Sequence, residues 1–238
     1  MQNILTIFKK ELAGYFNSAI AYIVIIVFLV LTGLWTWFLW SSIPAVGVLT
    51  MRPAFDIIPY TFLVLIPAVT MRSFSEEKKT GTIELLLTRP ITDMEIIMGK
   101  FLAALSLACL AILPTLIYVI SLSFLGSLDA GAIFGAYLGL ILLSGILVGI
   151  GILCSSLTEN QIVAFIMSFL IILFFLLIKF ALPFLPASMA SALEYLSVNY
   201  HYASISRGVL DSRDIIYYFS GIIILMLLTR TALESRKW

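Results

Sequence analysis

Residues 71–100 read MRSFSEEKKTGTIELLLTRPITDMEIIMGK, and this stretch decides how the chain folds. Ten charged residues fall in these thirty positions, although the chain of 238 residues has only 14 basic and 13 acidic side chains. Long and almost purely apolar runs lie on both sides of the stretch. Because charged side chains are costly in an apolar environment, the stretch must lie in water while its flanks lie elsewhere.

The composition excludes a water-soluble globular domain. The chain is 62% hydrophobic and 11% charged, with a mean hydropathy of +1.13. Soluble domains have about 25% charged and about 45–50% apolar residues. The long apolar runs favour membrane-spanning helices over the short alternating strands, about 10 residues each, of a membrane barrel. A net charge of +1 provides no general basic patch for nucleic acid.

Six apolar runs predict an all-α polytopic membrane protein with six transmembrane helices. The expected spans cover residues 20–40, 54–71, 96–125, 132–155, 162–182 and 215–228. The third run is too long for a simple span, and Pro114 predicts a kink in it. Pro59 and Pro67 predict either a kinked, cavity-lining second span or prolines that packing tolerates.

Glycines in the fourth span predict close packing against neighbouring helices. They form two small-xxx-small patterns, at Gly135 and Gly139 and again at Gly145 and Gly149. The two cysteines, Cys109 and Cys154, fall inside apolar runs and are interpreted as small buried hydrophobic residues.

The chain divides into an N-terminal segment, residues 1–17, and a six-span domain, residues 18–238. In residues 2–16 apolar side chains recur at helical spacing opposite Lys9, Lys10 and Glu11, which predicts an amphipathic helix in the membrane interface. An ordinary positively charged flank is the alternative. The six-span domain contains a polar loop, residues 72–95, and a connector, residues 183–213, whose mixed composition predicts short helices at the outer interface.

The distribution of basic residues predicts the orientation, because positively charged loops stay in the cytoplasm. Six spans place both termini on one side. With the termini inside, the inner segments hold ten basic residues and the outer segments hold four. The inner residues are Lys9, Lys10, Arg72, Lys78, Lys79, Arg89, Lys100, Arg230, Arg236 and Lys237; the outer ones are Arg52, Lys179, Arg207 and Arg213. The termini and the 72–95 loop are therefore expected in the cytoplasm.

The order of residues in the loop predicts the end of one helix, a tight turn, a short apolar helix and then the start of the third span. Residues 76–79 can continue a helix into water, Gly81 suits a helix C-terminus, and Thr82 can cap the next helix. Residues 83–88 are expected to form this short apolar helix, and Pro90 is expected to end it. Thr92 or Asp93 can then cap the third span. The apolar helix either lies beneath the membrane interface or fits a partner's groove.

This loop resembles the intracellular loop of ABC-2 type transporter permeases. The matching residues are Phe74, Glu76, Glu77, Gly81, Thr82, Glu84, Leu85, Leu86, Leu87, Arg89 and Pro90. The resemblance implies an ABC-2, type V exporter-like fold, in which two permease chains, identical or different, pair. It also implies that these residues form a coupling helix, which engages a cytoplasmic ATPase dimer.

The chain has no G-x-x-x-x-G-K-[S/T] pattern for binding ATP. The resemblance therefore implies that ATP is bound by the partner subunit, and that this chain is neither an enzyme nor the holder of a cofactor. No Ser-His-Asp arrangement or carboxylate pair at one membrane depth favours a membrane hydrolase.

Residues 201–214, HYASISRGVLDSRD, resemble the outer connector of permeases associated with gliding motility, and similar segments occur in copper-maturation permeases. The closer resemblance implies a bacterial inner-membrane protein in which His201, Arg207, Asp211 and Arg213 contact a membrane partner with a periplasmic domain. The alternative function is mechanical: the chain would pass ATP-driven motion to that partner without moving a substrate.

Three further polar sites have two interpretations each. Asp56 either pairs with Arg52 at the interface or marks a pathway. His201 is expected to be a hydrogen-bonding residue of the outer surface rather than a metal ligand, because no second histidine supports a site. Residues 159–161 are expected to cap the fifth span, with direct ATPase contact as the alternative.

Overall fold

The computed structural model describes residues 2–39, 50–82, 91–184 and 186–235, and the regular elements of these residues are helices. Their bounds in chain order are α1 Gln2–Asn17, α2 Ile20–Phe38, α4 Arg52–Thr70, α5 Ser75–Lys79, α7 Asp93–Ile112, η1 Leu113–Thr115, α8 Leu116–Ser123, α9 Ala130–Leu157, α10 Gln161–Ala181, η2 Leu182–Phe184, α11 Ala187–Leu196, α12 Val198–Ile205 and α13 Ser212–Glu234.

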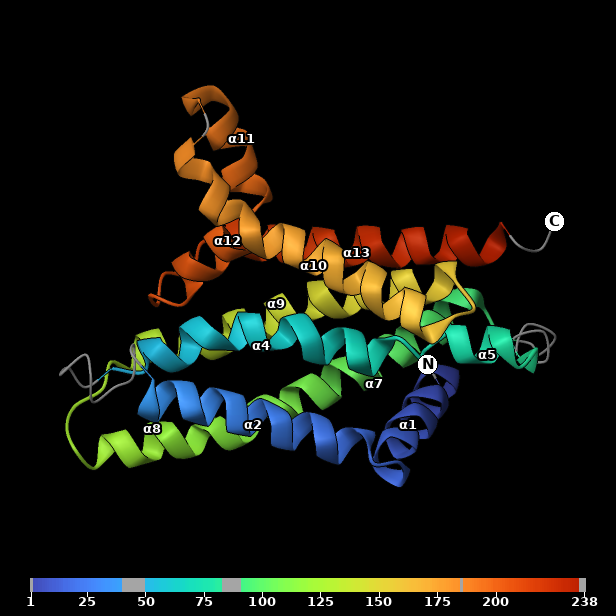
Figure 1. Ribbon diagram of the computed structural model, residues 1–238, viewed down its shortest axis with the longest axis horizontal. Coiled ribbons are helices and arrows are strands. Elements are labelled where there is room, and N and C mark those ends of the chain that lie inside the picture. Colours follow the sequence, from blue (N-terminus) through green and yellow to red (C-terminus); the bar gives the residue numbers. More distant parts are fainter. Residues whose placement is uncertain (1, 40–49, 83–90, 185, 236–238) are drawn as a thin grey trace.

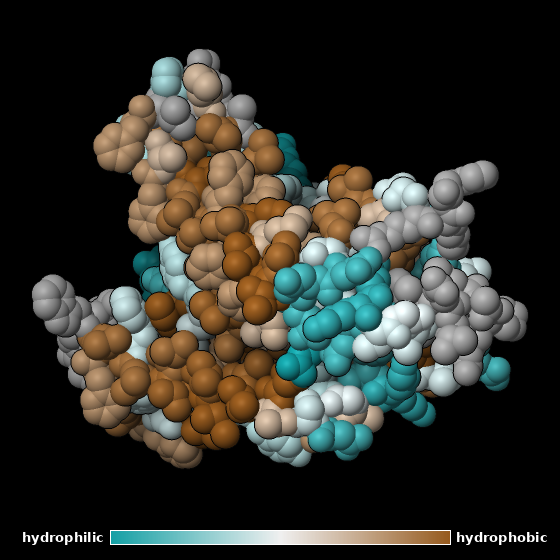
Figure 2. All heavy atoms as spheres, turned by 45° about the vertical axis from the view of Figure 1, so that its right-hand side comes forward, coloured by the Kyte–Doolittle hydropathy of each residue, from teal (hydrophilic) through white to brown (hydrophobic). Residues whose placement is uncertain are grey.

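Within the described residues, six helical segments are long and apolar enough to cross a membrane, as the sequence predicted. They are Ile20–Phe38, Arg52–Lys79, Asp93–Ser123, Ala130–Leu157, Gln161–Phe184 and Ser212–Glu234. These helices run along the long axis of the molecule (Figure 1). A broad band of hydrophobic side chains covers much of the surface in Figure 2, beside a hydrophilic patch. The chain is a multi-pass membrane protein.

Helix α9 lies at the centre of the bundle, and α4, α7, α10, α12 and α13 all pack against it. Its glycines make this approach possible, which confirms the predicted close packing. A Cβ atom at Gly151 would lie 2.0 Å from Thr70 Oγ1 of α4, and one at Gly135 would lie 2.3 Å from the carbonyl oxygen of Ile205 in α12. Larger side chains at these positions would push the neighbouring helices apart.

The prolines of the spans act in two different ways. At Pro114, where the sequence predicted a kink, the α-helix of the third span tightens to a 3-10 turn at Leu113–Thr115. Pro59 and Pro67 instead lie buried inside the continuous helix α4. Pro59 also lines a cavity at the end of the bundle where α4 begins.

The two ends of the bundle differ in their elements (Figure 1). We call the end with α5, the C-terminal end of α13 and the α9–α10 turn the α5 end. Helix α1 lies against α7 near this end. The other, where α12 and the start of α4 lie, is the α12 end, and from it α11 projects away from the bundle. The connector thus contains two short helices, as predicted.

Candidate functional site

A serine of the central helix fixes the junction between α4 and α5. Ser155 Oγ accepts hydrogen bonds from the backbone amides of Phe74 at 3.0 Å and Ser75 at 3.1 Å. The same hydroxyl donates to the carbonyl oxygen of Met71 at 3.0 Å. The first amides of a helix have no partner within it, so Ser155 satisfies groups that the chain cannot satisfy locally. The start of α5 is therefore tied to α9.

The end of α5 is tied to the same helix by a buried lysine. Lys78 is 7% exposed, and its Nζ donates to the carbonyl oxygen of Ser156 near the C-terminus of α9. A helix C-terminus has unpaired carbonyl groups and a partial negative charge, both of which favour an ammonium group. The neighbouring Lys79 is exposed. Only one of the two lysines is thus available to a partner.

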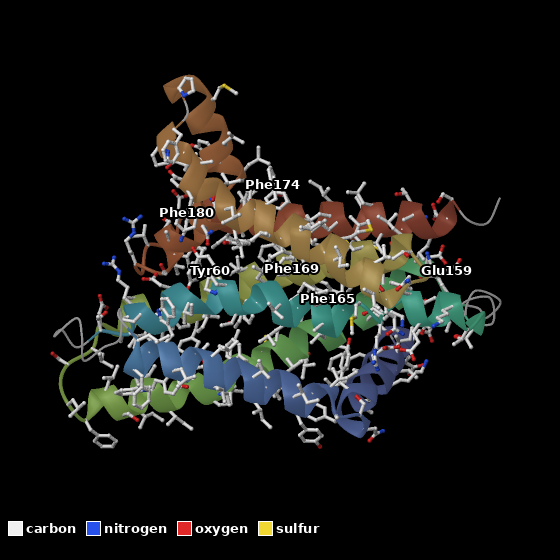
Figure 3. The ribbon with its side chains drawn as sticks, in the orientation of Figure 1. Tyr60, Glu159, Phe165, Phe169, Phe174 and Phe180 are labelled. Carbon is white, nitrogen blue, oxygen red and sulfur yellow. The ribbon has the colours of Figure 1, made fainter. Side chains whose placement is uncertain are left out.

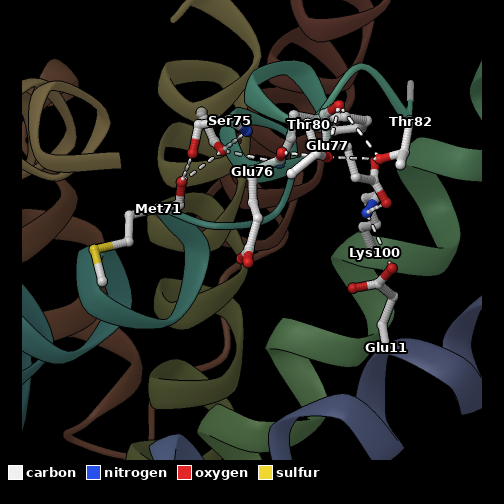
Figure 4. A network of polar contacts seen from close by, with 10 residues as sticks. Glu11, Met71, Ser75, Glu76, Glu77, Thr80, Thr82 and Lys100 are labelled. Carbon is white, nitrogen blue, oxygen red and sulfur yellow. Dashed lines mark hydrogen bonds and ion pairs between the residues drawn. The ribbon is translucent and has the colours of Figure 1, made fainter. Parts of the chain in front are cut away.

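Lys100 of α7 joins three helices in one buried contact (Figure 4). Its Nζ lies 2.8 Å from Glu77 Oε1 of α5 and 3.0 Å from Glu11 Oε1 of α1. It also lies 5.1 Å from the ring centre of Phe74, within range of a cation–π interaction. Lys100 is 2% exposed. We call Lys100, Glu11, Glu77 and Phe74 the Lys100 cluster.

The sequence interpretation missed the central members of this arrangement. Lys100 was counted only as one more cytoplasmic basic residue, and nothing in the sequence marked Ser155 or Ser156 among the small residues that end an apolar helix. Glu77 and Lys100 lie 23 positions apart, and Glu11 and Lys100 lie 89 apart. No local spacing rule connects such positions.

A second contact holds α1 against the start of α7. Thr92 Oγ1 accepts from the amide of Glu95 at 3.3 Å, and the Glu95 carboxylate accepts from the amide of Thr92 at 3.0 Å. This reciprocal capping box confirms Thr92 as the predicted cap. Asn3 Nδ2 of α1 donates to both oxygens of the same carboxylate at 3.3 Å. The local cap is thereby also a long-range contact.

The predicted turn after α5 is present. Gly81 follows the helix with a φ of +70°, a left-handed conformation that glycine adopts at low cost. Thr82 Oγ1 lies 3.0 Å from Thr80 Oγ1 and donates back to the carbonyl oxygen of Glu77 at 3.3 Å. The helix that Thr82 was expected to cap lies outside the described residues.

The predicted coupling residues fall into three groups. Phe74 and Glu77 belong to the Lys100 cluster, and Phe74 is 1% exposed, so it anchors α5 and presents no surface to a partner. Glu76, Gly81 and Thr82 are exposed. The others lie outside the described residues: Glu84, Leu85, Leu86, Leu87, Arg89 and Pro90.

At the α12 end, His201 is buried, and the expectation of a surface residue was wrong. It is 3% exposed. Its Nδ1 lies 2.7 Å from Asp214 Oδ1, and its Nε2 lies 3.0 Å from the carbonyl oxygen of Tyr195. The ring stacks on Tyr217 with 3.9 Å between centres. The expected hydrogen-bonding role is confirmed, but its partners hold α12 against α13 and the end of α11.

The other predicted connector residues lie at or near the surface. Asp211 caps α13, because its carboxylate accepts from the amide of Arg213 at 2.9 Å. Arg213 is exposed. Arg207 is also exposed, and its Nε donates to the carbonyl oxygen of Ala203 at 2.9 Å. Asp56 is exposed and interacts electrostatically with both Arg52 and Lys179.

A tyrosine fixes α12 to the start of α4. Tyr202 is 4% exposed, and its hydroxyl donates to the carbonyl oxygen of Phe55 at 3.1 Å. Burial, together with the nearby negative charge of Asp56, raises the pKa of Tyr202 well above its ordinary value. The hydroxyl therefore keeps its proton and remains a donor.

Two smaller expectations can be compared with the structure. Asn160 caps α10, as its side chain accepts from the amide of Ile162 at 2.9 Å.

Both cysteines are unpaired; Cys154 is buried, and Cys109 is partly so. Across residues 2–39, 50–82, 91–184 and 186–235, no three side chains of His, Cys, Asp or Glu lie close enough to hold a metal ion.

In the part of the chain that the structure describes, six hydrophobic helical segments with a short helix bonded to their polar end form the bundle of an all-helical membrane protein. The sequence model of the family described as ABC-2 family transporter protein matches residues 5–231, which include most of α1 and nearly all of the six spans. The chain belongs to this family and is a transmembrane permease component of an ABC transporter. No curated protein shows significant similarity to the chain. The family match does not distinguish the gliding-motility type.

Proposed function

We propose that this chain is a permease subunit driven by a separate cytoplasmic ATPase dimer, which engages the 72–95 loop. The observation that supports the proposal most strongly is the Lys100 cluster. It connects α5, which lies within the predicted coupling residues, to α1 and α7 through two ion pairs of 2.8 and 3.0 Å. A force applied to the loop would move these helices together, because buried ion pairs resist separation.

The α9 contacts extend the same mechanism into the bundle. Ser155 and the carbonyl of Ser156 hold both ends of α5. Helix α9 in turn packs against α4, α10 and α13. ATP binding and hydrolysis would tilt the coupling segment, and α9 would transmit this tilt to the helices around it. Access to a path between two permease chains, identical or different, would change.

The proposal includes an orientation in the bacterial inner membrane. The α5 end and both termini face the cytoplasm, in line with the ten inner and four outer basic residues. Residues 1–17 would lie in the membrane interface. In α1, Ile7, Phe8 and Leu12 pack against the bundle, and Lys9 and Lys10 are exposed. ATP would be bound by the partner, so this chain would need no cofactor of its own.

The physiological setting we favour is the gliding-motility type, on the basis of residues 201–214. A periplasmic-domain membrane protein would then contact the connector, residues 183–213. Arg207 and Arg213 are exposed and could form such contacts. Asp211 and His201 would support the connector from within. Segments similar to residues 201–214 occur in copper-maturation permeases, which are the second setting.

Mechanical transmission without a substrate is the second candidate function. The buried His201–Asp214 pair favours it. His201 Nδ1 of the connector lies 2.7 Å from Asp214 Oδ1 of the last span, so the pair joins these two elements directly. Motion of α13 would therefore reach the connector. In this version the outer connector is the working end of the protein.

The test uses the full chain purified together with the ATPase that associates with it. Lys100→Met should uncouple the complex, so that ATP turnover no longer responds to the permease. Gly81→Pro and Glu84→Ala should have the same effect while membrane insertion is unchanged. Arg230→Gln is the control, because its exposed i,i+4 pair with Glu234 lies outside the cluster. Unchanged turnover in Lys100→Met, Gly81→Pro and Glu84→Ala would disprove the coupling proposal.

A labelling experiment separates a moving connector from a static one. A cysteine introduced at Ser204, which is half-buried in α12, should react at different rates with and without nucleotide. Equal rates in both states would contradict a moving connector and remove the support for mechanical transmission.

A further inference from the structure

A cavity of about 420 Å³ lies at the α12 end, between the first turns of α4, the last turn of α10 and helix α12. It is lined by Arg52, Asp56, Pro59, Lys179, Asn199, Tyr202, Ala203, Ser206 and Arg207. A second cavity of about 290 Å³ also has Arg52, Ser206 and Arg207 in its wall. Neither cavity takes part in the coupling mechanism at the opposite end.

The charges in the larger cavity are unequal. Arg52, Lys179 and Arg207 face it together with a single acidic side chain, Asp56. All three basic side chains are exposed. One carboxylate cannot neutralise three cations, so the cavity has a net positive potential. Arginine guanidinium groups have a donor geometry that matches phosphate oxygens, and a lysine adds a compact positive charge.

Buried hydrogen bonds hold the wall of this cavity in place. Tyr202 donates to the carbonyl oxygen of Phe55 at 3.1 Å, which fixes α12 to α4. Asn199 is 8% exposed and donates to the carbonyl oxygen of Leu176 at 2.9 Å, which fixes α12 to α10. Helices α4 and α10, which carry Arg52 and Lys179, and helix α12, which ends two residues before Arg207, are thus held at a set spacing. A preformed site loses less entropy on binding than a flexible one.

The cavity lies where the headgroups of the surrounding lipids would be. Arg52 begins its spanning segment, and Lys179 lies in the last turn of α10. Lys179 Nζ is 4.9 Å from the ring centre of Tyr60 and 5.0 Å from that of Phe180, and Figure 3 shows both rings at this end of α4 and α10. Aromatic rings and snorkelling lysines gather at the membrane–water interface.

We propose that this cavity binds a phosphate group, and that the group belongs to the headgroup of an anionic lipid. The two arginines and Lys179 bind the phosphate oxygens, while Asp56 limits the affinity through its negative charge. A free inorganic phosphate has the same chemistry and is the other possible source. The proposal is independent of the ATPase partner.

The test measures phosphatidylglycerol bound to the purified full chain by native mass spectrometry, with zwitterionic phosphatidylcholine as the reference lipid. Arg52→Gln, Lys179→Gln and Arg207→Gln should each weaken phosphatidylglycerol binding about fivefold, the effect of one basic residue at a membrane surface. Asp56→Asn should strengthen binding about as much, because it removes the only opposing charge in the lining. Arg213→Gln is the matched control, being exposed at the same end but outside the cavity.

The outcomes distinguish a lipid headgroup from free phosphate as the ligand, and they also show whether the cavity is a binding site. If millimolar inorganic phosphate does not displace the lipid, the ligand is the lipid headgroup; if it does, the cavity is a site for small phosphate anions as well. Opposite signs for Asp56→Asn and Arg207→Gln support the site in either case. If Arg213→Gln reduces binding as much as the three cavity variants, or if Asp56→Asn does not increase it, the proposal is overturned. An increase in phosphatidylglycerol binding by Asp56→Asn cannot result from misfolding, because misfolding would weaken binding.

Discussion

Lys100 Nζ lies 2.8 Å from Glu77 Oε1 and so joins the long helix α7 to the five-residue helix α5. An isolated helix of this length is unstable in water, because nucleation costs more than a few hydrogen bonds return. The ion pair and the contacts from α9 supply the missing stabilisation. Helix α5 therefore keeps its position relative to the bundle, as the proposed coupling role requires.

Replacing Lys100 by methionine should destabilise the protein by about 2–4 kcal/mol, because two carboxylates would lose their cation in a poorly solvated place. Thermal unfolding in detergent micelles measures the loss. Because Glu77 and Glu11 are partly exposed, we expect the lower part of this range. The double variant Lys100→Met with Glu77→Gln should be less destabilised than the sum of the two single variants. Strict additivity would show that the pair does not couple the two helices.

Alanine at Gly151 should destabilise the bundle by about 1–3 kcal/mol, the usual cost of overpacking a core. The new Cβ would lie 2.0 Å from Thr70 Oγ1 and 2.8 Å from Thr70 Cβ, so α4 and α9 would have to separate. Gly14→Ala is the matched control. Apart from its chain neighbours and the backbone of its own helix, no atom of the described residues lies within 4 Å of a Cβ built there, and alanine in a helix should stabilise by about 0.5–1 kcal/mol. A similar change at both glycines would contradict the close approach of α4 and α9.

Thr92→Ala should cost about 1 kcal/mol, since it removes the side-chain half of the capping box. The loss should also loosen α1, because Asn3 donates to the same Glu95 carboxylate. Hydrogen exchange of the α1 amides measures this second effect. Ser121→Ala serves as the control, since its hydroxyl is exposed and bonds only within its own helix, to the carbonyl oxygen of Ile117. Protection of α1 equal to that of the unmodified protein would show that the cap is purely local.

Asp214→Ala should destabilise the docking of α12 by about 1–3 kcal/mol, because buried His201 would lose its partner at 2.7 Å. Limited proteolysis of the connector measures this, and cleavage should become faster. Arg213→Ala, one residue away and exposed, should leave the cleavage rate unchanged. If cleavage became faster only in Arg213→Ala, the exposed Arg213 would stabilise the connector instead of the buried His201–Asp214 pair.

The elements of the fold that depend on neighbouring residues were predictable. Apolar length and charge contrast located the six spans, with helix starts within three residues of those observed for five of them and an exact match for the first. The cap of the third span was narrowed to Thr92 or Asp93, and Gly81 was identified, because a cap and a left-handed turn need particular side chains within a few positions. The helix break at Pro114 has an equally local cause.

Partners far apart in the sequence were not predictable in the same way. The amphipathic pattern of residues 2–16 indicated a helix, but it did not indicate that Glu11 pairs with Lys100 of α7. His201 and Asp214 both occur in the segment quoted for the connector, and their burial results only from the packing of α12 against α13. Polarity alone had favoured a surface position.

The sequence by itself determined that a charged segment within residues 71–100 separates two membrane spans, because the transfer of its charges out of water would be prohibitive. It also determined, to within three residues, where the six spanning helices start, since helix starts depend on neighbouring residues. Only the tertiary structure decided which of those charges are available to a partner. Lys78 and Lys100 are buried, whereas Glu76 and Lys79 remain in water. The physical reason is that burial and ion pairing depend on helices that the chain brings together from distant positions.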